Sequence, residues 1–217
     1  QTQYTQTALF AFQVALFRLL EHWGITPDAL IGHSIGELTA AHLAGVLTLQ
    51  DACTLVTTRG QLMQAAPTGG TMLAIQATED EIRATLPEDG DQVTIAAING
   101  PTSLVIAGDQ DAVLTLGEHW KTKGRKTNPL TVSHAFHSPH MNSALHDFHN
   151  IAQTLTYHPP RIPVISNLTG TTATTHQLTS PQYWTDHIRQ PVHFHQGITT
   201  LHHQHHTTTY LELAPHP

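Results

Sequence analysis

The segment Gly32-His33-Ser34-Ile35-Gly36 has the residue types and spacing of a nucleophile elbow, in which a serine lies on a sharp turn between a strand and a helix. The apolar run 29–31 precedes it and the helix-favouring residues 37–43 follow it, so the predicted context is strand, tight turn and helix. Such a turn exposes the serine hydroxyl to a carbonyl carbon, and the backbone N–H of Ile35 would point at a developing oxyanion. A glycine-rich turn without chemistry is the alternative, since the pattern also arises by chance.

A serine nucleophile needs a base, and the segment 133–141 offers three histidines, His134, His137 and His140. His137 directly precedes Ser138-Pro139, which is typical of a helix cap followed by a first-turn proline. The positive end of a helix disfavours imidazolium and would keep a base neutral. A packing role is open for each of the three, and spacing alone does not choose among them.

Arg59 falls on the apolar face of a helix predicted over residues 49–65. A guanidinium on a buried face needs a partner, because its desolvation is otherwise unfavourable. The plainer expectation is a carboxylate of the protein, such as Glu37 or Asp51. The alternative is the carboxylate of a bound substrate, which matches the bidentate fork of arginine.

The periodicity of the chain predicts an α/β protein in which a small subdomain interrupts a larger one. A helix is expected over residues 7–23, closed by Gly24. The order β-α-β-β-α-β then predicts an inserted ferredoxin-like subdomain, with strands at 71–75, 93–98, 103–107 and 130–132 and helices at 78–86 and 109–120. The α/β pattern of the larger part resumes with helices at 140–155, 181–188 and 192–203 and strands at 162–166 and 209–213.

Composition excludes several classes of protein. The 217 residues carry a net charge of -7, which argues against nucleic acid as a partner. No apolar run approaches the roughly 18 residues of a membrane span, and the single cysteine, Cys53, cannot form an internal disulfide, so we expect a cytoplasmic location. Histidines gather near the end, in His202-His203-Gln204-His205-His206. This run lacks a Cys or carboxylate at ligand spacing, so no metal site is predicted, and a His-rich docking module remains an alternative.

Together these segments resemble a known family. The chain is similar to the acyltransferase domains of modular type I polyketide synthases and, more distantly, to the malonyl-CoA:acyl carrier protein transacylases of fatty acid synthesis. The resemblance implies an α/β-hydrolase-like subdomain over 1–70 and 133–217, with a ferredoxin-like subdomain over 71–132. It rests on the segments 5–10, Gly32-His33-Ser34-Ile35-Gly36-Glu37, 58–63, Asn99-Gly100-Pro101, His134-Ala135-Phe136-His137-Ser138-Pro139, 189–192 and Tyr210-Leu211-Glu212-Leu213-Ala214-Pro215-His216.

Carried over residue by residue, the family implies Ser34 as the acylated nucleophile and His137 as general base and acid. Arg59 would bind the free carboxylate of the acyl group. The family orients its histidine through backbone carbonyls, and Gln190 is implied as one supplier. His33 would line the carboxylate end of the pocket.

Two places in the family track the choice of acyl group, and both favour malonyl. Ile35 stands where methylmalonyl-type domains usually carry Gln, and His134-Ala135-Phe136-His137 stands where they usually carry Tyr-Ala-Ser-His. Phe136 would fill the space of an α-methyl group. A single carbon of this kind is worth roughly 1–3 kcal/mol in discrimination.

The implied reaction takes malonyl from malonyl-CoA, through an ester on Ser34, to the phosphopantetheine thiol of an acyl carrier protein. No tightly bound cofactor is implied, and neighbouring ketosynthase and other synthase domains are the implied partners. The family begins upstream with a Gly-Gln-Gly-x-Gln segment that supplies a second oxyanion N–H. We expect this N-terminal part to be missing here and the segment to be competent only within a longer chain. The alternative reaction class is a serine hydrolase or thioesterase using the same elbow.

Overall fold

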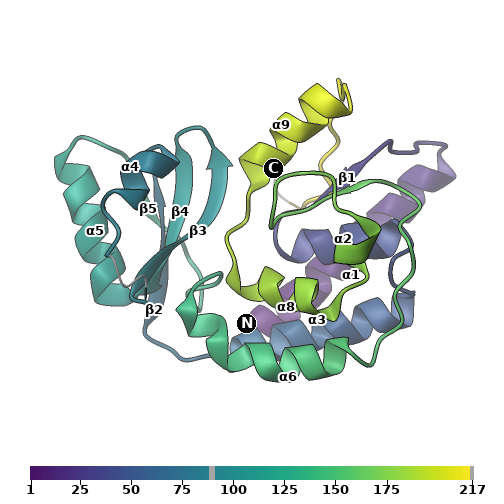
Figure 1. Ribbon diagram of the computed structural model, residues 1–217, viewed down its shortest axis with the longest axis horizontal. Helices are drawn as coiled ribbons and strands as arrows, with labels where there is room; N and C mark the ends of the chain where they lie inside the picture. Colours follow the sequence, from purple (N-terminus) through teal and green to yellow (C-terminus); the bar gives the residue numbers. More distant parts are fainter. Residues whose placement is uncertain (88–90, 216–217) are drawn as a thin grey trace.

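The computed structural model describes residues 1–87 and 91–215, which form a small sheet-containing body beside a larger helical one (Figure 1). The small body contains β2 (Gly70–Ile75), α4 (Glu79–Arg83), β3 (Val93–Gly100), β4 (Ser103–Asp109), α5 (Gln110–Thr122) and β5 (Thr127–Pro129). The larger body contains α1 (Thr2–His22), β1 (Leu30–Ile31), α2 (Ile35–Leu43), α3 (Leu49–Gln64), the 3-10 turn η1 (Pro139–Met141), α6 (Asn142–Ala152), β6 (Val164–Ile165), α7 (Thr175–Leu178), α8 (Pro181–Arg189) and α9 (Phe194–Gln204).

The small body is a four-stranded antiparallel sheet in the order β3-β4-β2-β5. Its side chains alternate in direction, as the two-residue period of a strand requires. Leu73 and Ile75 of β2 join Ile106 of β4 in a core beneath α4 and α5, where Ile82 and Trp120 close it. The teal helices therefore cover one face of the sheet (Figure 1).

The other face of the same sheet turns toward the larger body. Met72 of β2 and Val105 of β4 pack there with Ala97 of β3. They meet Ala135, on the segment that leads from the sheet into the larger body, and Val192, on the connection between α8 and α9. This second core fixes those two segments relative to the sheet.

The larger body gathers its helices around one apolar core and a short parallel strand pair. Leu38, Leu55, Phe148 and Trp184 are fully buried side chains of that core, and they come from α2, α3, α6 and α8. The pair β1–β6 runs in register, with Leu30 opposite Val164. Because parallel strands end at the same edge of a sheet, the segments that follow β1 and β6 become neighbours.

Two strand predictions were wrong. Residues 130–132 lie beyond β5, which ends at Pro129, and have no regular secondary structure. Val132 is exposed, and its N–H donates to the carbonyl of Leu130. The edge position of β5 explains the shift, since an edge strand needs few apolar residues and tolerates proline. Residues 209–213 form no strand. Leu211 of this segment is 62% exposed, so it is not packed into a core as the side chain of a buried strand would be. His216, the last residue of the motif that begins at Tyr210, lies outside them.

Within the described residues, no helix has both the length and the apolar character needed to cross a membrane.

Candidate functional site

The turn after β1 holds Ser34 in a strained backbone conformation. Ser34 has φ of 51° and ψ of -115°, in a region that non-glycine residues rarely adopt. Of the two glycines of the motif, only Gly32 is required by the close packing of the turn. A Cβ added at Gly32 would lie 2.0 Å from the backbone carbon of Gly36, whereas a Cβ at Gly36 would meet nothing closer than Gln13 Nε2 at 4.0 Å. The close approach of the backbone at Gly32 is therefore what the elbow requires.

Ser34 and His137 lie within hydrogen-bond distance although 103 residues separate them in the sequence. Ser34 Oγ is 2.8 Å from His137 Nε2, and His137 Nδ1 is 2.9 Å from the carbonyl oxygen of Gln190. A carbonyl oxygen only accepts, so Nδ1 carries the proton and Nε2 of a neutral ring is free to accept from the serine hydroxyl. His137 also has a positive φ of 54°, and Ser138 caps the short turn that follows it.

The carbonyl of Gln190 is held in place from both sides. Gln190 ends α8 in an extended conformation, which is the one that a following proline favours. Val192 then forms a bridge to the small sheet, accepting from the N–H of Ile98 at 2.8 Å and donating to the carbonyl of Ala96 at 2.9 Å. The sheet thus anchors the segment that orients His137.

Arg59 of α3 extends its guanidinium to the same serine. It is 1% exposed, its Nη2 donates to Ser34 Oγ at 2.9 Å and its Nη1 donates to Gln6 Oε1 at 2.8 Å. Among the described residues, no carboxylate lies within the 4.0 Å that defines an ion pair with it, and its Nε has no acceptor. The expectation of a structural ion pair with Glu37 or Asp51 was wrong, because both carboxylates are engaged elsewhere.

Burial and charge set the protonation of these groups. Burial lowers the pKa of His137 well below 6.5, and the positive charge of Arg59 lowers it further, while the carbonyl of Gln190 acts in the opposite direction. His137 is therefore neutral at physiological pH. Burial lowers the pKa of Arg59 to about 10, opposed by the negative charge of Glu37, so Arg59 remains a cation.

The remaining predicted residues surround this group. His33, next to the serine, donates from Nε2 to Asn99 Oδ1 of β3 at 2.9 Å, which links the elbow to the small sheet. Ile35 is buried in the core of the larger body, and Phe136 packs between that core and the sheet. His134 is buried beside Phe136, with Nδ1 2.9 Å from Ser133 Oγ.

Three residues with contacts at the site were missed by the sequence analysis as site residues. Gln6 is a buried polar residue on α1 that accepts from Arg59. Asn167 follows β6 and bonds the elbow directly, and Glu37 is a fully buried carboxylate one turn after Ser34. A signal for Asn167 was present, since polar residues after neighbouring parallel strands meet at one edge.

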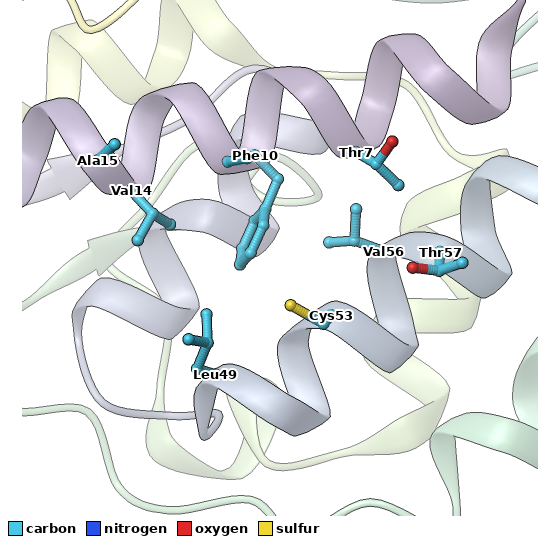
Figure 2. Close-up of a pocket in the computed structure, with 9 residues that line it drawn as sticks. Thr7, Phe10, Val14, Ala15, Leu49, Cys53, Val56 and Thr57 are labelled. Carbon is cyan, nitrogen blue, oxygen red and sulfur yellow. The ribbon is translucent and has the colours of Figure 1, made fainter.

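Other features lie away from these atoms. Over residues 1–87 and 91–215, no three His, Cys, Asp or Glu side chains are placed to share a metal ion. In the histidine-rich end, His205 Nε2 instead lies 2.8 Å from Thr172 Oγ1. An apolar groove of about 260 Å³ between α1 and α3, lined by Phe10, Leu49 and Cys53 among others, contains none of the reacting groups (Figure 2).

Comparison with known proteins identifies the class of enzyme to which the chain belongs. The sequence profile of the family described as "Acyl transferase domain" matches residues 1–217, the whole of the chain. The chain therefore belongs to the acyl transferase domain family, and it is an enzyme domain of the acyltransferase class.

Individual relatives narrow the class of acyltransferase further. The chain is 55% identical over 201 residues, 93% of its length and 9% of the relative's, to the spectinabilin polyketide synthase system protein NorB of Streptomyces orinoci. The acyltransferase domain from the second module of the salinomycin polyketide synthase superposes with a TM-score of 0.95 at 51% identity, covering 99% of this chain and 50% of that one. The malonyl CoA-acyl carrier protein transacylase (fabD) from Coxiella burnetii superposes with a TM-score of 0.88 at 32% identity, and the match covers 99% of this chain and 70% of that one. The predicted resemblance is confirmed: this is an acyltransferase domain of the kind found in type I polyketide synthases, and it spans half or less of the first two relatives.

Proposed function

We propose that this domain loads malonyl units, taking malonyl from malonyl-CoA as an ester on Ser34 and passing it to the phosphopantetheine thiol of an acyl carrier protein. The observation that carries the proposal is the buried guanidinium of Arg59, 2.9 Å from Ser34 Oγ and without a carboxylate partner among the described residues. A cation at that point suits an acyl group that itself carries a carboxylate. The name of the Coxiella burnetii relative, which specifies malonyl CoA, supports the same substrate class.

In the first half of the proposed reaction, Ser34 Oγ attacks the thioester carbonyl carbon while its proton passes to His137 Nε2, 2.8 Å away. The C–S bond then breaks and the thiol of coenzyme A leaves with that proton. The N–H of Ile35, at the start of α2, would donate to the oxyanion, since it has no backbone acceptor among the described residues.

The second half reverses these roles. The phosphopantetheine thiol gives its proton to His137 and attacks the ester carbonyl, and Ser34 leaves with the proton returned. The Gln190 carbonyl keeps Nδ1 protonated throughout, so that Nε2 is the atom that exchanges the proton. No tightly bound cofactor takes part.

Arg59 would bind the free carboxylate of the malonyl ester. Its Nη2 already touches the oxygen that becomes the ester oxygen, so a carboxylate one methylene beyond the ester carbonyl lies within reach of the same fork. The buried, unpartnered Nε leaves an additional donor for it. His33, tied to Asn99, would line this end of the pocket.

Malonyl is proposed over methylmalonyl because of the bulk of the residues next to Ser34 and His137 in the chain, Ile35 and Phe136. Phe136 packs between the two cores, so it cannot swing away freely to admit an α-methyl group. Ile35 is buried beside the serine and His134 is buried against Phe136, which holds Phe136 in place. The expected preference is on the order of 10–200-fold.

We also propose the architecture that the family implies. Residues 1–70 and 133–217 would form the α/β-hydrolase-like subdomain, and residues 71–132 the ferredoxin-like one, for which the antiparallel order β3-β4-β2-β5 is suitable. In the longer protein, an acyl carrier protein and neighbouring ketosynthase and other synthase domains would be partners, in the cytoplasm.

The test is intact mass spectrometry of the full-length protein after incubation with malonyl-CoA. The expected result is one malonyl adduct, absent in Ser34→Ala, that transfers to a carrier protein carrying phosphopantetheine. Release of the adduct as free malonate at the same rate, with or without the carrier protein, would instead show the hydrolase alternative. Absence of an adduct in the unsubstituted protein would overturn both.

A further inference from the structure

The side chain of Asn167 bonds two backbone groups of the elbow, the carbonyl of Gly32 and the N–H of Ser34. Asn167 is 1% exposed. Its Oδ1 accepts from the backbone N–H of Ser34 at 2.8 Å, and its Nδ2 donates to the carbonyl of Gly32 at 2.7 Å. One neighbour is a donor and the other an acceptor, so a primary amide matches both while a carboxylate cannot.

The backbone of Asn167 is itself held by a buried carboxylate. The N–H of Asn167 donates to Glu37 Oε2 at 2.7 Å, and Glu37 is fully buried. Tyr183 donates its hydroxyl to Oε1 of the same carboxylate, and His187 Nε2 lies 3.1 Å from Oε2. Since Glu37 lies one helical turn after Ser34, this closes a ring that runs from Ser34 through α2 to Glu37 and back through Asn167.

This ring acts where the backbone is strained. The positive φ of Ser34 is a conformation that persists only when the surroundings determine it from several directions. The two bonds of Asn167 fix the two consecutive peptide units, Gly32–His33 and His33–Ser34, that lead into the strained residue. They also occupy the N–H of Ser34, which leaves the N–H of Ile35 as the amide available to an oxyanion.

We propose that Asn167, held by Glu37, is the positioning residue for the nucleophile. It acts through the backbone of Ser34, and none of its bonds involves Arg59, so it determines how fast the serine is acylated and not how tightly the acyl carboxylate is held. The inference rests on the proposed function, since it takes Ser34 as the nucleophile.

The test compares Asn167→Ala and Asn167→Ser with Asn150→Ala, an exposed asparagine of α6, in the full-length protein. We expect kcat for malonyl loading to fall about 10²-fold in both Asn167 variants, as for a small displacement of a reacting group, with KM for malonyl-CoA within threefold. Labelling of Ser34 by a neutral fluorophosphonate probe should slow by the same factor, because the defect lies in the serine. Asn150→Ala should match the unsubstituted protein in all three measurements.

Thermal unfolding separates positioning from folding. If Asn167→Ala does not fold, Asn167→Ser carries the test, since its hydroxyl keeps a polar group in the buried site but is too short to bond both the carbonyl of Gly32 and the N–H of Ser34. Wild-type kcat and labelling in a folded Asn167 variant would overturn the proposal, and so would a loss confined to KM or to malonyl-CoA. Failure of the proposed function looks different, because the unsubstituted protein would then form no malonyl ester.

Discussion

Replacing Arg59 should separate malonyl from uncharged acyl groups. Two of its N–H groups make bonds at 2.8 and 2.9 Å, and both could turn to a carboxylate when malonyl is bound. Hydrogen bonds to a charged group contribute about 1.5–3 kcal/mol each, so losing two removes about 3–6 kcal/mol. With 1.4 kcal/mol for each factor of ten, Arg59→Ala should lower kcat/KM for malonyl-CoA roughly 10²–10⁴-fold.

The assay is loading of the full-length protein with malonyl-CoA and with acetyl-CoA, measured by quenched-flow mass spectrometry. Acetyl loading should fall less, by about 10–10²-fold, since in that reaction the bond from Arg59 to Ser34 Oγ is the one lost contact that involves a reacting atom. Arg59→Met keeps the apolar stem in its buried position and should behave as Arg59→Ala does. Arg18→Ala is the matched control, because Arg18 forms an exposed pair with Glu21 and should leave both substrates unaffected.

An equal loss for malonyl and acetyl would refute the carboxylate clamp. It would mean that Arg59 serves only the serine hydroxyl or the packing of Gln6 against α3. Unchanged malonyl loading in a folded Arg59→Ala protein would refute it as well.

Three further results are expected. Burial and the charge of Arg59 lower the pKa of His137, so the neutral base persists as pH falls, and the acid limb of kcat/KM for malonyl-CoA should lie below pH 6.5; a limb above that value contradicts the assignment. Gly32→Ala should abolish labelling of Ser34 by malonyl-CoA, since its Cβ would lie 2.0 Å from a backbone carbon, whereas Gly36→Ala should keep the melting temperature of the unsubstituted protein. Phe136→Ser should raise methylmalonyl loading relative to malonyl by about tenfold or more in a competition read by intact mass, and an unchanged ratio would remove Phe136 from the determinants of specificity.

The sequence was sufficient where a local pattern carries the information. The turn around Ser34 was predicted from the residues on either side of it, and the order of elements between β2 and β5 was predicted from alternating and helical periodicity. The strand at 130–132 was misplaced because an apolar pattern outweighed the real edge strand, whose residues are Thr127, Asn128 and Pro129.

The contacts around the serine could not be predicted in this way, since they depend on distant parts of the chain. Ser34 and His137 are separated by 103 residues and His137 and Gln190 by 53, so local spacing could not choose His137 from its neighbours. The partners of Arg59 could not be predicted from local spacing either. The helical stripe correctly placed it in a buried position, but only the three-dimensional arrangement shows that Glu37 points to Asn167 and not to Arg59.

Orientation of His137 by a carbonyl, and not by a carboxylate, has a consequence for the charge at the site. The carbonyl of Gln190 fixes the ring without supplying a negative charge, so Arg59 and the burial of the ring keep the pKa of His137 low. On the proposed function, a bound malonyl carboxylate neutralises Arg59 and removes one cause of that lowering. Binding of the correct acyl group then makes His137 a stronger base, because the positive charge that opposed its protonation is now paired. An uncharged acyl group would leave that charge in place, so the same arginine would favour malonyl both in binding and in the proton transfer that follows.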